Sequence, residues 1–261
     1  MTKAWVILVV LALTASAGGQ GPETAPAPVG GTGLDQIAKS LPALDAPQTV
    51  ATALKWLALV TVLSLAPAIL VMVTSFTRIA VVLGLLRQAL ATQQLPPNQI
   101  LFALALLMTL VVMAPVCKDV HAEAVKPYLD GQLSQADALT AAEARVRSFM
   151  ISQVEAGDNT DDVYLFLSED LAAKEALTWR EVPTISLLPA FAISELKIAF
   201  LIGFRVFLPF LVIDMLVASV LVSMGMLMLP PVLISLPFKL LLFVLADGWH
   251  LVVGTLMNSF Q

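Results

Sequence analysis

The sequence has few polar or reactive residues. Only 13% of its 261 residues are charged, and it has one cysteine, two histidines and two tyrosines. The single cysteine, Cys117, excludes an intrachain disulfide and a cysteine-rich metal site. Soluble domains are about 25% charged, so the low charge content excludes an ordinary soluble protein. The hydrophobic content of 59% excludes a disordered chain, because disorder requires low hydrophobicity and high charge.

The motifs of common enzymes are also missing. The sequence contains no G-x-S-x-G, H-E-x-x-H or Walker phosphate-binding motif. His121-Ala122-Glu123 matches half of a zinc deaminase signature, but the cysteine pair that completes it is absent. A formal net charge of −5 argues against a nucleic-acid partner, which would require a basic surface. We therefore predict that the protein is not an enzyme and has no catalytic, cofactor or metal site.

The first residues have the pattern of a secretory signal peptide. Lys3 precedes ten apolar residues, 4–13, which are too few to cross about 30 Å of hydrocarbon. Ala15-Ser16-Ala17 matches the cleavage motif, so we expect cleavage after Ala17; an uncleaved anchor helix is the alternative. The residues that follow are rich in Gly, Pro, Ala and Thr, which is typical of a flexible segment.

Long apolar stretches dominate the rest of the chain. There are four, at 56–73, 100–117, 198–222 and 232–253, and each is long enough, or nearly so, to cross a bilayer as a helix. Residues 74–99 contain Arg78 and Arg87 and no acidic residue, so the positive-inside rule predicts that they lie in the cytoplasm. Residues 118–197 then lie outside, and the loop near Met226 lies inside.

Residues 118–197 form an acidic insert that contains 7 of the 14 basic and 14 of the 19 acidic residues. Four apolar residues share one face at helical spacing: Val146, Phe149, Met150 and Val154. They predict a helix, and a second helix is expected to begin at Asp161 after a turn at 157–159. We expect the apolar face of the first helix to pack against neighbouring subunits.

Together these patterns predict an all-α membrane protein made of helical hairpins and a helical periplasmic insert. The expected divisions are a cleavable signal peptide (1–17), a flexible N-terminal segment (18–52), two apolar spans with a cytoplasmic loop (53–117), the acidic insert (118–197), and two apolar spans that form a hairpin with a methionine-rich tip (198–261).

The hairpin contains four charged residues: Arg205, Asp214, Lys239 and Asp247. A charge at the centre of a lipid-exposed helix costs about 2.5–3.5 kcal/mol, so we expect these side chains to be buried against partners. An antiparallel hairpin with its tip near residue 226 would place Asp214 level with Lys239. It would also place Arg205 level with Asp247. Contacts with neighbouring subunits are the alternative to pairing within one chain.

The tip of the hairpin is rich in methionine. Residues 224–231 include Met226, Leu227 and Met228 and end in two prolines. Methionine fills irregular gaps without directional hydrogen bonds. A ring of such tips, one from each subunit, would close around a passage and yield to whatever passes through it. Ordinary packing is the alternative interpretation of the same residues.

Several ordered blocks of sequence resemble the FliP family of flagellar biosynthetic proteins. They are Thr74-Ser75-Phe76-Thr77-Arg78-Ile79, Leu85-Leu86-Arg87-Gln88-Ala89-Leu90, Pro96-Pro97-Asn98-Gln99, Ser194-Glu195-Leu196-Lys197, Ile234-Ser235-Leu236-Pro237-Phe238-Lys239 and Asp247-Gly248-Trp249, together with 226–231. The resemblance covers roughly residues 53–260.

The resemblance implies a subunit of the flagellar type III export gate, in the bacterial inner membrane at the basal body. It implies a multi-pass protein that forms a closed oligomer with other copies of itself and with FliQ-type and FliR-type subunits. Unfolded flagellar proteins would pass through that oligomer. In such families the methionine-rich loop is a gasket, which maps here to Met226, Leu227 and Met228, with Leu227 departing from the methionine of some members.

Three other interpretations remain open. The first is the homologous subunit of a virulence injectisome. The second is a small ion channel or proton-coupled transporter, in which the charges of the apolar stretches would form a relay. The third is a purely structural scaffold, in which the tip residues only pack.

Overall fold

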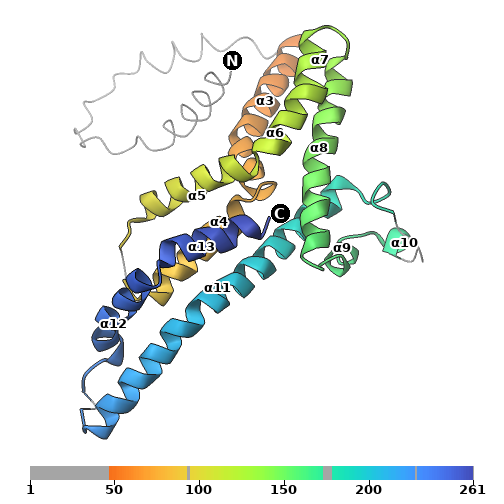
Figure 1. The fold of residues 1–261 in the computed structure, drawn as a ribbon. Coiled ribbons are helices and arrows are strands. Elements are labelled where there is room, and N and C mark those ends of the chain that lie inside the picture. The colour runs from red at the N-terminus through yellow and green to blue at the C-terminus, as the bar shows by residue number, and fades with distance from the viewer. Residues whose placement is uncertain (1–46, 93–94, 173–177, 227, 261) are drawn as a thin grey trace, which may run out of the picture. The chain divides into compact units, whose positions relative to one another are not determined.

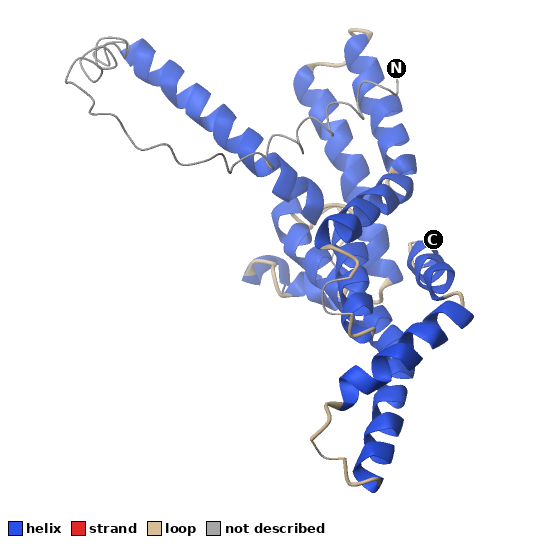
Figure 2. Cartoon of the chain, turned by 90° about the vertical axis from the view of Figure 1, so that its left-hand side faces the viewer, coloured by secondary structure: helices blue, strands red, loops and turns tan. Residues whose placement is uncertain are grey.

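The computed structural model describes residues 47–92, 95–172, 178–226 and 228–260. Every regular element in these ranges is helical, which confirms the predicted all-α class (Figure 2). The chain divides into two units, 1–62 and 63–261. The described part of the first unit belongs to helix α3 (Pro47–Met72), which begins before residue 53, the expected start of the division that contains the first two apolar spans. The predicted signal peptide and its cleavage site at Ala17 lie outside the described residues.

The second unit contains the remaining helices (Figure 1). In chain order they are α4 (Phe76–Ala89), α5 (Asn98–Val112), α6 (Ala114–Val120), a π-helical turn η1 (His121–Val125), α7 (Lys126–Leu129), α8 (Gln135–Ala156), α9 (Asp161–Tyr164), α10 (Glu169–Ala172), α11 (Thr184–Ser223), α12 (Pro231–Leu245) and α13 (Gly248–Asn258).

Helix α11 organises this unit. It is 40 residues long and packs against α4, α8, α12 and α13. The predicted third apolar stretch is therefore only its second part, because the helix begins at Thr184 rather than near residue 198. The segment from Thr184 to Lys197, which we had expected inside the acidic insert, continues into the apolar hairpin as one helix.

Helix α4 lies along α11 and is mostly buried. Ile79, Val82, Leu83 and Leu86 follow the i, i+3, i+4, i+7 spacing of a helical apolar face, and each is at most 1% exposed. At Gly203 of α11 an added Cβ would lie 2.2 Å from Leu85 Cδ1, so the two helices approach closely there. The expected cytoplasmic loop 74–99 is thus largely a core helix of the fold.

A second core joins α8 to the start of α11. Met150 and Val154 of α8 are buried with Leu187, Ala190 and Phe191 of α11, and Val146 and Phe149 pack partly buried against the same cluster. The predicted helix face is confirmed. Its expected contact with neighbouring subunits is not needed to cover it, because α11 of the same chain covers it.

The region after α8 differs from the sequence-based expectation. A turn does follow α8, and Asp158 there has a positive φ of 53°. The helix expected from Asp161 is a single turn, α9, and a separate turn, α10, begins at Glu169. Asp162 accepts a hydrogen bond from Lys197 Nζ at 2.5 Å, which holds α9 against α11.

Two of the predicted straight spans are bent. Helices α5 and α6 meet at 53°, next to Pro115, which can neither donate a backbone hydrogen bond nor fit inside a regular helix without a clash. Helices α12 and α13 meet at 65°, where Asp247 adopts a left-handed backbone conformation. Among the described helices, two could cross a membrane by length and composition, at Leu54–Met72 and Thr184–Ser223, and up to four if each bent pair counts as one span.

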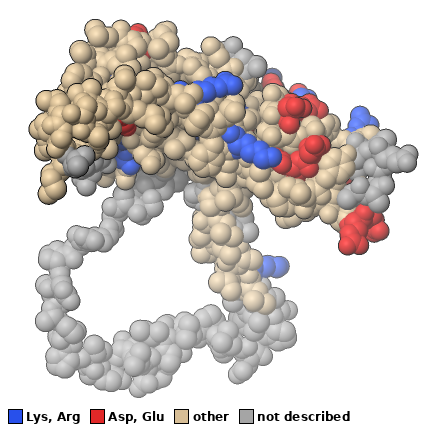
Figure 3. All heavy atoms as spheres, turned by 90° about the horizontal axis from the view of Figure 1, so that it is seen from below, with Lys and Arg blue, Asp and Glu red and all other residues tan. Residues whose placement is uncertain are grey.

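The charged residues are unevenly distributed on the surface. Figure 3 shows acidic side chains gathered at the end of the molecule that contains α8 to α10, while the hairpin end has few charges. The hairpin instead exposes large apolar side chains, among them Phe204, Met215 and Leu241, each more than half exposed. This surface suits a lipid or protein environment rather than water.

Candidate functional site

The N-terminal half of α11, which we call its base, carries a buried ion pair that the sequence analysis did not predict. Arg78 of α4 is 1% exposed and Glu195 of α11 is fully buried. Arg78 Nε donates to Glu195 Oε2 at 2.9 Å, and Arg78 Nη2 pairs with Glu195 Oε1. This two-point contact is the strong geometry of an arginine–carboxylate pair.

The remaining donors of Arg78 are also used. Nη2 donates to Gln153 Oε1 of α8 at 3.0 Å, and Nη1 donates to the backbone oxygen of Ser259 at 2.6 Å. The guanidinium carbon lies 4.0 Å from the centroid of the Phe260 ring, close enough for a cation–π contact. One side chain therefore ties together α4, α8, α11 and the segment that follows α13.

This pair corrects the predicted topology. The positive-inside rule had placed Arg78 in the cytoplasm and the segment containing Glu195 outside, yet the two side chains are in direct contact. The rule counts positive charges in solvent-exposed loops, whereas Arg78 is buried and its charge is balanced by Glu195. A signal for this was present, because Arg78 lies four residues before Val82 and so shares the apolar face of the helix.

The hairpin carries a second ion pair, between the two residues that the sequence analysis placed level with each other. Lys239 Nζ of α12 lies 2.6 Å from Asp214 Oδ2 of α11. Ser235 Oγ donates to Asp214 Oδ1 at 2.5 Å, and Lys239 Nζ also donates to the backbone oxygen of Ala89 at 3.1 Å. Lys239 is 2% exposed and Asp214 is 28% exposed. The pair therefore joins the hairpin to the last turn of α4.

The other level-matched pair does not form within the chain. Arg205 and Asp247 are both exposed, and no ion pair joins them in the described part of the molecule. The residue count from the tip assumed that the second helix of the hairpin runs straight to Asp247. In the structure α12 ends at Leu245 and the chain bends at Asp247. The expectation that these two charges are buried within one chain is not met, and contacts with other subunits remain a prediction.

The two described methionines at the tip of the hairpin are exposed. Gly225 has a φ of 74°, which ends α11 in a conformation that glycine adopts without strain. Met226 is 41% exposed and Met228 is 96% exposed. Leu227 lies outside the described residues. Two flexible apolar side chains thus project from the end of the hairpin, where packing within one chain leaves them open.

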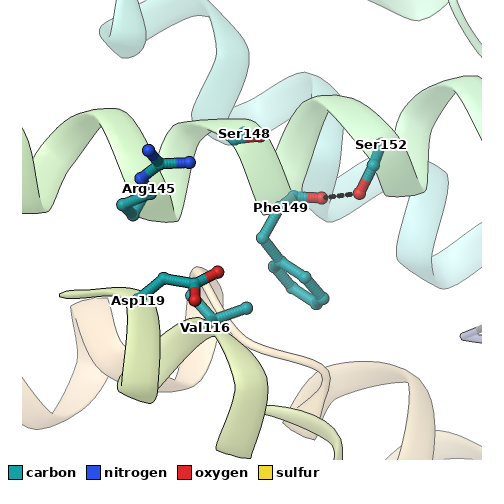
Figure 4. Close-up of a pocket in the computed structure, with 6 residues that line it drawn as sticks. All are labelled: Val116, Asp119, Arg145, Ser148, Phe149 and Ser152. Atoms are coloured by element: carbon teal, nitrogen blue, oxygen red, sulfur yellow. Dashed lines mark hydrogen bonds between the residues drawn. The ribbon is translucent and has the colours of Figure 1, made fainter. Parts of the chain in front are cut away.

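A small pocket lies between α6 and α8, outside the hairpin. It is lined by Val116, Asp119, Arg145, Ser148, Phe149 and Ser152 (Figure 4). Phe149 extends from α8 toward α6, and Arg145 is bound to Glu123 in an exposed ion pair. In the part of the chain that the structure describes, no group of three His, Cys, Asp or Glu side chains is placed to hold a metal ion.

These features define a class. Long apolar helices, ion pairs buried between them and an exposed methionine tip are those of a helical, membrane-associated protein. The FliP family model matches residues 59–256, and the chain belongs to the FliP family.

Curated relatives agree with this family. The flagellar biosynthetic protein FliP of Caulobacter vibrioides is 55% identical over 203 residues, which are 78% of this chain and 74% of that protein. Its namesake in Bacillus subtilis (strain 168) is 50% identical over 215 residues, 82% of this chain and 95% of that protein. The protein of the same name in Treponema pallidum is 46% identical over 217 residues, 82% of this chain and 79% of that protein.

Proposed function

We propose that this chain is a subunit of the flagellar type III protein export gate and acts in flagellum biogenesis. The relatives that support this function are all named as flagellar biosynthetic proteins. The single structural observation that carries the mechanism is the hairpin α11–α12, whose tip exposes Met226 and Met228. Other copies of this chain and FliQ-type and FliR-type subunits would complete the gate in the bacterial inner membrane.

The proposed mechanism is gating by the methionine tips. Apolar side chains that meet at a constriction exclude water and ions by dewetting. Methionine is unbranched and flexible, so a ring of tips can close on itself and yet yield when an unfolded chain enters. In this proposal Met226 and Met228 belong to the gasket with Leu227, and the energy for transport comes from other parts of the apparatus.

In the same proposal the ion pairs hold the tips in place. Lys239 anchors the hairpin to the end of α4, and Arg78 anchors the opposite end of α4 to α11 and α8. The tips are thus mounted on a rigid frame. The same contacts weigh against a channel or transporter with a charge relay, because Arg78 and Lys239 are bound to backbone oxygens and carboxylates within the frame.

The gasket proposal is tested by ion leakage through the closed gate. Changing Met226→Ala together with Met228→Ala shortens two tip side chains, and we expect a clear increase in small-ion conductance across membranes that contain the assembled gate. Met215→Ala is the matched control, because Met215 is also exposed, at 67%, but lies on α11 away from the tip. An unchanged conductance in the double variant, with the gate assembled, would rule out the gasket.

The broader function is tested by secretion. Deleting the gene should abolish flagellin secretion and motility, and a plasmid copy should restore both. A motile mutant that still secretes flagellin would contradict the export function. A changed ion flux across the membrane without loss of secretion would instead favour a channel or transporter.

A further inference from the structure

Two charged side chains of the hairpin have no partner among the residues that the structure describes. Residues 198–261 contain four charged residues, and Asp214 and Lys239 bind each other. Arg205 and Asp247 are exposed and take part in none of the ion pairs or side-chain hydrogen bonds of the described chain. Asp247 stands at the N-terminal end of α13 but makes no side-chain capping bond, so its carboxylate is free to accept an external donor.

Arg205 and Asp247 project from different sides of the hairpin. Arg205 lies nine residues before Asp214, which is about two and a half helical turns. The extra half turn directs Arg205 to the side of α11 opposite to Asp214. Because Asp214 faces Lys239 and Ser235 of α12, Arg205 faces away from α12. Asp247 stands at the far end of α12, so the positive charge lies on the α11 flank of the hairpin and the negative charge on the α12 flank.

The two charges lie at about the same height along the hairpin. The contact between Asp214 and Lys239 fixes the register of the two antiparallel helices. From that contact Arg205 is nine residues along α11 and Asp247 is eight residues along α12 in the same direction. At about 1.5 Å per residue the two heights are about 13 Å and about 12 Å above the pair, before the bend at Asp247 takes effect.

The surroundings of both charges are apolar. Leu201, Leu208 and Val212 share the face of Arg205 at i−4, i+3 and i+7, and they are 54%, 43% and 53% exposed. On the other flank Val244 and Leu245 precede Asp247 and are 73% and 76% exposed. Each flank is thus an apolar strip with one unpaired charge, and the two flanks have opposite signs.

We propose that these flanks are the two halves of one interface between copies of this chain, in which Arg205 of one copy binds Asp247 of the next. The contact is head-to-tail, because each copy presents a different flank to each neighbour. Since both charges lie at nearly the same height, the contact would hold neighbouring hairpins side by side with little shift along the hairpin axis. This proposal depends on the proposed function in one respect: it assumes that several copies of the chain assemble around the passage.

Cross-linking between two differently tagged chains tests this contact. Both chains carry Cys117→Ser, which removes the native cysteine. One chain carries Arg205→Cys and the other carries Asp247→Cys, and they are co-expressed in the full export gate and treated with a short bismaleimide. A flexible linker is used because the long arginine side chain spans more than the roughly 7 Å between Cα atoms that a disulfide tolerates.

We expect one covalent dimer that contains both tags. The control chain carries Thr255→Cys in place of Asp247→Cys; Thr255 is exposed on the same helix α13 but about two turns further on, beyond the reach of the linker. A dimer of equal yield in the control, or no two-tag dimer at all, would overturn the contact. The mass of the native complex is measured in the same samples. An intact oligomer that gives no covalent two-tag dimer contradicts the Arg205–Asp247 contact and leaves the proposed function standing.

Charge reversal provides a second readout. Arg205→Asp and Asp247→Arg alone should each reduce the fraction of assembled oligomer several-fold, because each places like charges across the interface. Together they should restore assembly, because the pair re-forms with exchanged signs. If both single variants assemble as well as the unchanged chain, or the double variant assembles no better than either single variant, the ion pair is disproved.

Discussion

The two halves of helix α11 differ in how completely the chain covers them. Between Thr184 and Phe210 the helix buries ten residues against α4, α8 and the other helices of the unit, whereas beyond Phe210 it buries only Leu221. The ion pair in the first half, Arg78–Glu195, is almost fully buried. The pair in the second half, Asp214–Lys239, leaves its carboxylate 28% exposed.

This difference separates the folding core from the surface left for partners. The first half buries one face and its ion pair within one chain, whereas side chains on its other face, such as Phe200 and Phe204, stay exposed. Beyond Phe210 the helix exposes apolar side chains such as Met215 and Leu216, which lipid or other subunits can cover. A single helix thus joins a well-buried N-terminal half to a C-terminal half that is mostly exposed.

Among substitutions that test this difference between the two halves, we expect the largest loss of stability at the buried pair Arg78–Glu195. Arg78→Met leaves Glu195 buried without a counter-charge, and removing one partner of a buried pair costs about 3–5 kcal/mol. We expect a large drop in the melting temperature of the full-length protein in detergent. Arg205→Met, which removes an unpaired surface arginine, should change the free energy of unfolding by no more than about 0.5 kcal/mol.

A second substitution tests whether the loss comes from the stranded charge. Arg78→Met combined with Glu195→Met should recover much of the stability, because two apolar side chains of similar volume can replace a buried ion pair. A single Arg78→Met variant as stable as the Arg205→Met control would show that the base is not the better-covered region.

The hairpin pair should give a smaller and asymmetric effect. Asp214→Asn leaves the ammonium group of Lys239 buried without a counter-charge, so we expect a loss of about 1–3 kcal/mol. Lys239→Met should cost less, because Asp214 is partly exposed and keeps its bond from Ser235. Chemical denaturation of the two variants side by side measures the asymmetry, and equal losses would contradict it.

The charge exchange at this pair has a defined outcome. The double variant Asp214→Lys with Lys239→Asp should recover only part of the function that each single variant loses. The reason is that the new carboxylate at 239 would face the Ala89 backbone oxygen, where the native chain has an amine. Flagellin secretion is the readout. No recovery over either single variant would argue against a direct pair.

The smallest effect is expected from close packing between α4 and α11. Gly203→Ala places a methyl group against Leu85, and overpacking of about 1–3 kcal/mol is offset by about 1 kcal/mol of gained helix propensity. We expect a net loss of about 1 kcal/mol in thermal unfolding, relieved by adding Leu85→Ala. Gly254→Ala is the matched control, because no atom lies within 4 Å of its added Cβ, and it should be neutral or stabilising.

The sequence predicted more of the hairpin than of the base. The spacing of Asp214 and Lys239 about the tip was enough to place them in contact, because the two straight helical segments between them and the tip have a fixed rise per residue. The same counting failed for Asp247, because the left-handed backbone at that residue redirects the chain by 65°. No residue count includes such a bend.

The base was missed because its partners are far apart in the sequence. Arg78 and Glu195 are separated by 117 residues, and Gln153 lies in a third segment. Loop charge alone suggested that Arg78 was an exposed cytoplasmic residue. The apolar spacing of Ile79, Val82 and Leu83 would have indicated a buried helix, although not which helix covers it.

By itself, the sequence determined that this protein is helical, apolar and a member of the FliP family, and it placed a methionine tip between two charged helices. These properties follow from composition and local spacing, which act over a few turns. The tertiary structure alone decided that α4 is a core helix, that Arg78 holds four segments together, and that Arg205 and Asp247 stay apart. Those outcomes depend on how distant segments pack and where helices bend, and local spacing does not specify either.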